Sequence, residues 1–140
     1  MATFTMRRTV TSIGPLQVVI MVLVAATALT HLYLGLITHI MLATQPALVS
    51  QLGGAPGLTL WAVLFDLNFA GYVALGTALY LPALRRFQRL ARWALMGYVA
   101  VTFIGYFVFA QGHFNMMGYA DKAVELLLIA LLAIEDRRAH

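Results

Sequence analysis

The stretch that decides the fold is Pro15–Thr44, PLQVVIMVLVAATALTHLYLGLITHIMLAT, which contains no Asp, Glu, Lys or Arg. About 20 mostly apolar residues are enough for a helix to cross the hydrocarbon core of a bilayer. This stretch is longer than one crossing needs, so we expect a tilted or protruding helix that begins at Pro15. Its apolar run is too long for a signal peptide, and no small-residue cleavage site follows it. The stretch therefore predicts a retained membrane span.

Three further apolar stretches follow, at about 58–81, 90–110 and 119–134. Their apolar runs are continuous rather than alternating, which favours helices, and an open sheet edge cannot lie in lipid. Of the 140 residues, 62% are apolar, 10% are charged and none is cysteine, whereas about 25% of a soluble domain is charged. This composition excludes a soluble enzyme and a disulfide scaffold. We expect one all-α domain over residues 1–140, an antiparallel bundle of four transmembrane helices.

The basic residues predict the orientation of this bundle. The loops Gln45–Gly57 and Gln111–Gly118 contain no Lys or Arg, and eight of the nine basic residues lie at the opposite ends of the spans: Arg7, Arg8, Arg85, Arg86, Arg89, Arg92, Arg137 and Arg138. Basic residues accumulate on the cytoplasmic side of membrane proteins. We therefore expect both termini in the cytoplasm, at a prokaryotic plasma membrane. The net charge of +4 then reports topology, and we expect no nucleic-acid partner.

Ionisable side chains gather in the outer half of the predicted bundle. His31, Asp66 and Glu125 each lie about seven residues from the outer end of a span, which corresponds to a depth of about 10 Å. Charged groups inside a membrane are costly and mark functional sites. We expect an outward-facing site of His31, Asp66 and Glu125, with Asn68 and Tyr106 near the same level. Nearer its mouth lie His39, His113, Asp121 and Lys122, of which the last two are one helical turn from Glu125.

These residue types permit several functions. A carboxylate beside a histidine can bind a proton or a cation, and we expect such binding, or that of a small lipid-like ligand, without catalysis. His31, Asp66 and Glu125 also suit a transition metal, and His39 with His113 suits haem b. Asp66 or Glu125 as acid with His31 as base would suit an enzyme acting on a lipid-like substrate, although no catalytic motif is present. The structural alternative is that buried charges pair with one another and fix the helix register.

Four segments resemble small uncharacterised four-helix membrane proteins of bacteria and archaea: Asn68–Pro82 (NFAGYVALGTALYLP), Arg85–Arg92, Gly97–Val108 (GYVAVTFIGYFV) and Gly118–Glu135 (GYADKAVELLLIALLAIE). The resemblance covers about the last two thirds of the chain. It implies the same four-span topology and a role for Gly118–Glu125 beyond anchoring. It transfers no catalytic residue, because those proteins have no assigned activity.

Small residues in the predicted spans indicate close helix packing. Glycine lets the backbones of neighbouring membrane helices approach one another, and the spans contain Gly35, Gly71, Gly76, Gly97 and Gly105. We expect some of this packing to be intermolecular, in a homo-oligomer or in a larger membrane complex.

Overall fold

The computed structural model describes residues 13–109 and 116–139, which form helices and no strand. The long helices are α1 (Pro15–Thr44), α3 (Gly54–Tyr80), α4 (Gln88–Phe109) and α5 (Met116–Arg138). A short helix α2 (Pro46–Gln51) joins α1 to α3, and a 3-10 helix η1 (Pro82–Phe87) joins α3 to α4. The all-α expectation is confirmed. His113 and Arg7 and Arg8 lie outside the described residues, so the proposed haem pair is not tested.

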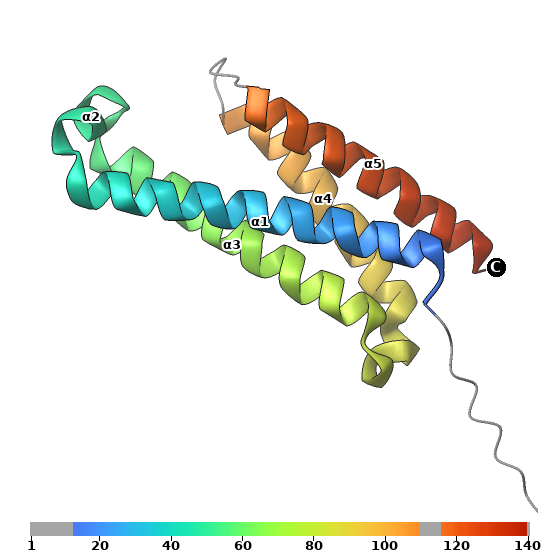
Figure 1. Ribbon diagram of the computed structural model, residues 1–140. Helices are drawn as coiled ribbons and strands as arrows, with labels where there is room; N and C mark the ends of the chain where they lie inside the picture. The colour runs from blue at the N-terminus through green and yellow to red at the C-terminus, as the bar shows by residue number, and fades with distance from the viewer. Residues whose placement is uncertain (1–12, 110–115, 140) are drawn as a thin grey trace, which may run out of the picture.

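The long helices pack side by side in a closed ring. Helix α1 contacts α3 and α5, and α4 contacts the same two helices from the other side. Figure 1 shows the pair α1 and α3, capped by α2, reaching beyond the ends of α4 and α5. The contacts enclose an apolar core of Ile20, Val24, Ala28, Tyr72, Leu79, Ala91, Leu95, Val99, Leu128 and Leu132.

Proline and glycine set the connections between helices. Pro46 begins α2 and Pro82 begins η1, because proline lacks the N–H that only the first helical turn can spare. Gly53 and Gly54 have φ angles of 100° and 84°, which side chains with a Cβ rarely adopt. The chain can therefore reverse direction between α2 and α3.

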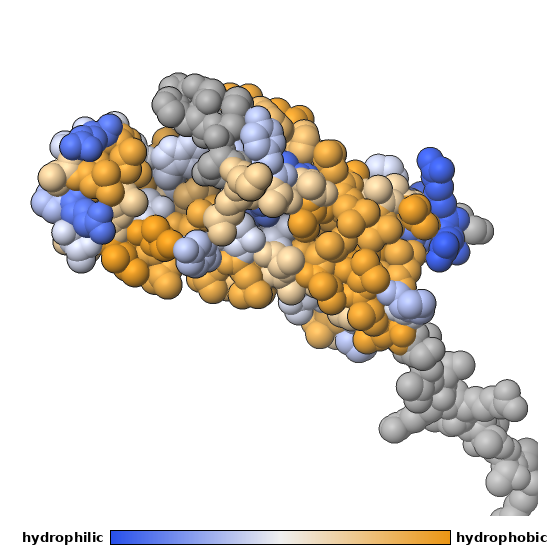
Figure 2. Space-filling view, turned by 45° about the horizontal axis from the view of Figure 1, so that its top comes forward, coloured by the Kyte–Doolittle hydropathy of each residue, from blue (hydrophilic) through white to orange (hydrophobic). Residues whose placement is uncertain are grey.

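Three helical segments are long and apolar enough to cross a membrane: Pro15–Thr44, Gly54–Tyr80 and Pro82–Phe109. Helix α5, expected as a fourth span, is not among them, because Asp121, Lys122 and Glu125 interrupt its apolar run. Figure 2 shows a broad hydrophobic surface between two hydrophilic ends. Such a surface is far larger than the apolar patches of soluble monomers, and it suits lipid contact.

Some of the expected glycine contacts are present within the chain. A Cβ on Gly76 would lie 2.6 Å from Val24 of α1, and one on Gly71 would lie 2.3 Å from the Tyr98 hydroxyl of α4. A Cβ on Gly35 would lie 2.7 Å from Asp66. Gly97 differs, since nothing lies within 4 Å of such a Cβ. Close packing at the first three positions is therefore intramolecular.

Candidate functional site

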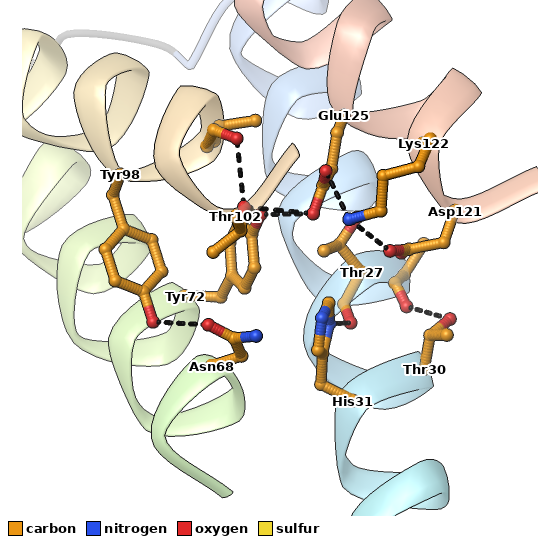
Figure 3. Close-up of polar contacts among 12 residues, drawn as sticks. Thr27, Thr30, His31, Asn68, Tyr72, Tyr98, Thr102, Asp121, Lys122 and Glu125 are labelled. Carbon is orange, nitrogen blue, oxygen red and sulfur yellow. Dashed lines mark hydrogen bonds and ion pairs between the residues drawn. The ribbon is translucent and has the colours of Figure 1, made fainter. Parts of the chain in front are cut away.

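Glu125 of α5 lies at the centre of a buried polar cluster. Its side chain is fully buried, yet hydroxyl groups from two other helices reach one of its carboxylate oxygens. The Tyr72 hydroxyl of α3 donates to Oε1 over 2.8 Å, and Thr102 of α4 donates to the same atom over 3.1 Å. Figure 3 shows these side chains converging from separate helices. The carboxylate thus joins three helices where they face one another.

Lys122 compensates part of the negative charge in this cluster. Its Nζ donates to Glu125 Oε2 over 2.5 Å and lies 3.1 Å from Asp121 Oδ2. The ammonium also faces the Tyr106 ring of α4, 5.5 Å from its centroid, a distance at which a cation and an aromatic ring attract. Lys122 is only 5% exposed and Asp121 only 8%. These two residues, expected at the mouth of a site, belong to its interior.

His31 of α1 completes the cluster from the opposite side. Its Nδ1 lies 2.9 Å from the Thr27 carbonyl oxygen. Because a carbonyl can only accept, Nδ1 must carry the hydrogen, which leaves the Nε2 lone pair of the neutral ring available. A ligand atom of His31 lies within 4.8 Å of carboxylate oxygens of Asp121 and Glu125, which are themselves within that distance of each other. The His31 ring packs against Tyr72 with 5.6 Å between centroids.

Two buried oxygen atoms at this cluster have no hydrogen-bond partner among the described residues. Thr27 Oγ1 and Asp121 Oδ1 make no hydrogen bond to any residue within 13–109 or 116–139. Thr27 is 1% exposed and lies beside His31, whose ring bonds to its carbonyl. Buried polar atoms nearly always have a partner, so these two oxygens are exceptions within the described part of the chain.

Asp66, which we expected beside His31 and Glu125, lies elsewhere. Its Oδ2 is 2.8 Å from Nε2 of His39, and the two side chains are about half exposed, at 50% and 52%. Asp66 precedes Tyr72 by six residues, which rotates it by about 120° around α3. Asp121 takes the place that depth alone had suggested for Asp66. The expected metal set of His31, Asp66 and Glu125 is therefore not assembled, and His31, Asp121 and Glu125 are grouped instead.

Asn68 and Tyr106 make packing contacts next to the cluster. Asn68 Oδ1 accepts a hydrogen bond from the Tyr98 hydroxyl over 3.0 Å, which fixes α3 against α4. The same hydroxyl lies 3.1 Å from the Leu67 carbonyl. Tyr106 packs on Gly118, where a Cβ would lie 2.2 Å from its hydroxyl. Asn68 thus has a packing partner within the chain, which its position along the helix did not reveal.

A second buried ionic cluster lies at the arginine-rich end. Arg92 of α4 is 5% exposed, and its guanidinium donates to Glu135 over 3.1 Å and to Asp136 over 2.9 Å. The Tyr80 hydroxyl of α3 also contacts Glu135, at 3.3 Å. From the sequence, Arg92 was expected only to mark the cytoplasmic end of a span. Its helical spacing from Leu95 and Val99, which lie three and seven residues further along α4 and are buried, was the available indication that it points into the protein.

An apolar layer separates the two ionic clusters. Glu125 and Glu135 are ten residues apart on α5, which corresponds to about 15 Å. Between them the buried residues are hydrocarbon side chains, among them Leu79, Leu95, Leu128 and Leu132, each at most 1% exposed. No polar side chain of the described core bridges this layer. The cluster around Glu125 therefore has no polar connection to the cluster around Arg92 within the described residues.

Comparisons with protein-family models, curated proteins and solved structures give no match to this chain.

Proposed function

We propose that this chain is a non-enzymatic integral membrane protein that binds one proton at the cluster of His31, Asp121, Lys122 and Glu125. It crosses the bilayer four times with both termini in the cytoplasm, and it acts as an oligomer or as a subunit of a larger membrane complex. The proton enters from the outer side, because the apolar layer blocks the inner side.

The direction in which α5 presents its charges supports a fourth span. Asp121, Lys122, Glu125 and Glu135 are all buried against the other helices. The opposite side of α5 is apolar, with Leu126 at 53% and Leu127 at 49% exposed. A membrane helix can carry ionisable groups when they face the interior of the bundle and pair there. The number of charged residues in α5 therefore does not by itself argue against a membrane span, because these residues face the other helices and the opposite side of α5 is apolar.

The charge balance of the cluster is the observation that carries the proposal. Two carboxylates and one ammonium leave one negative charge uncompensated while the His31 ring is neutral. A net charge buried away from water is strongly unfavourable. One proton on the available Nε2 of His31 makes the cluster neutral, and histidine is the side chain whose charge changes most readily near physiological pH.

A metal ion is the second candidate, since three ligand atoms of His31, Asp121 and Glu125 lie within 4.8 Å of one another. The Nδ1 bond to a backbone carbonyl is also typical of histidines that bind metal through Nε2. Lys122 argues against this candidate. Its ammonium already contacts both carboxylates, and a divalent cation would meet that positive charge at close range. The arrangement favours the proton.

Nuclear magnetic resonance of the histidine rings tests the proposal. The full chain, labelled with ¹⁵N-histidine, is placed in lipid nanodiscs and titrated with acid, and the variant His31→Gln assigns the His31 signals. We expect the His31 ring to change from the neutral form with hydrogen on Nδ1 to the doubly protonated form while the protein stays folded. A His31 ring that stays neutral throughout would refute proton binding. Stoichiometric Zn²⁺ binding that shifts the His31 signals would favour the metal site instead.

A further inference from the structure

Two open clefts lie next to each other at the arginine-rich end, away from the proposed proton site. The larger, of about 430 Å³, is lined by residues of the α1 start, α4 and the α5 end, including Gln17 and Arg138. The smaller, of about 220 Å³, is lined by Arg85, Arg86 and Arg89 among others. Both clefts share Gln88 and Arg92. The combined volume lies in the range of small-molecule sites, about 300–1,000 Å³.

The residues that line the clefts leave a positive excess. Leaving Arg85 aside, the arginines Arg86, Arg89, Arg92 and Arg138 contribute four positive charges, and the acids Glu135 and Asp136, which are already engaged by Arg92, oppose two of them. Two positive charges therefore remain, together with the amide groups of Gln17 and Gln88. Planar guanidinium groups bind phosphate oxygens through paired N–H donors, which makes arginine the preferred residue for this anion.

Exposed apolar side chains adjoin the cleft-lining arginines along the chain. Leu90 and Trp93 follow Arg89 within about one turn of α4 and are 67% and 56% exposed. Phe87, at the end of η1, is 44% exposed. A free phosphate ion makes no favourable contact with exposed apolar side chains. A phospholipid can make such contacts, because its acyl chains lie next to its phosphate group.

We propose that these clefts bind the phosphate group of an anionic phospholipid. Arg138 and Arg89 hold the phosphate from the larger and the smaller cleft, on either side of Arg92. The acyl chains lie along Leu90 and Trp93. This site is independent of the proton site, because the two are separated by about 15 Å along α5.

Native mass spectrometry of the full chain in detergent micelles tests the proposal. Phosphatidylglycerol is titrated into the protein, with phosphatidylcholine in parallel, and the bound lipids are counted. Arg138→Gln and Arg89→Gln are compared with the matched control Arg137→Gln, which removes the same charge from the same end of α5 but lines neither cleft. Arg138→Lys tests whether charge without the planar group restores binding.

We expect phosphatidylglycerol to bind in preference to phosphatidylcholine. Loss of one charge-assisted contact should weaken its binding about tenfold in Arg138→Gln and in Arg89→Gln. Arg137→Gln should bind as the wild type does. Equal weakening in Arg137→Gln would overturn the site, since only general charge would then matter. Inorganic phosphate that competes fully, with no contribution from the lipid chains, would overturn the lipid assignment. Monodisperse size-exclusion profiles establish that each variant is folded.

Discussion

The substitution Glu125→Gln tests the charge balance of the buried cluster most directly. Glutamine keeps the size of the side chain and an oxygen that accepts from Tyr72 and Thr102, but it removes the negative charge. A ligand atom of His31 lies within 4.8 Å of a Glu125 carboxylate oxygen. At that distance and an effective dielectric constant of about 20, the attraction between a protonated His31 and Glu125 is about 3 kcal/mol. The charged fraction of His31 at a fixed pH should therefore fall in Glu125→Gln.

The substitution Lys122→Met should act in the opposite direction. It removes the ammonium that contacts both carboxylates, so the charge of the cluster becomes more negative and the charged fraction of His31 rises. The charged fraction of His31 in each of the two variants is read from the ¹⁵N signals of its ring, in nanodiscs at one fixed neutral pH. The pair of variants is informative because general damage to the fold would not move His31 in two opposite directions.

Glu135→Gln is the matched control for this experiment. It makes the same chemical change on the same helix, about 15 Å from Glu125, so its direct Coulomb effect on His31 should be much smaller. Equal responses of His31 to Glu125→Gln and Glu135→Gln would refute the reasoning, as would changes of the same sign in Glu125→Gln and Lys122→Met.

Three further substitutions and one control, Gly97→Ala, test the packing that positions the two clusters, and each is measured by denaturation in detergent micelles. Tyr72→Phe removes a hydroxyl bonded to the buried carboxylate over 2.8 Å and should destabilise the protein by about 2 kcal/mol; an unchanged midpoint would show that this bond adds nothing. Gly71→Ala places a methyl group 2.3 Å from the Tyr98 hydroxyl and should destabilise by about 1–3 kcal/mol, whereas Gly97→Ala meets nothing within 4 Å and should be neutral or slightly stabilising. Arg92→Met leaves two buried or half-buried carboxylates without their cation and should cost about 3–5 kcal/mol, and a loss below 1 kcal/mol would contradict the importance of that ion pair.

The positions of the long helices could be predicted from the sequence. A stretch without charge such as Pro15–Thr44 has one low-energy conformation in lipid, because only a helix satisfies all of its backbone groups internally. The expected segment 58–81 appears as Gly54–Tyr80, and 90–110 appears as Gln88–Phe109.

The sequence also indicated part of the cluster. Lys122 and Glu125 are three residues apart, so they share a face of one helix in any fold that keeps α5 helical. The ion pair between them is local, and it needs no tertiary contact. The proximity of Glu125 to His31, in contrast, depends on how α5 packs against α1.

What the tertiary structure alone decided is the rotation of each helix about its axis and its shift along its neighbours. Residue counting places Asp66 at the depth of His31, but the packing of α3 against α1 pairs Asp66 with His39, which lies eight residues, or about 12 Å, further along α1. The same packing turns Tyr72 toward Glu125 and buries Arg92 beside Glu135. Helix formation is governed by interactions between residues a few positions apart, whereas rotation is governed by which side chains of distant segments fit together. The sequence by itself therefore determined the helices, and only the packing of those helices determined which ionisable groups meet.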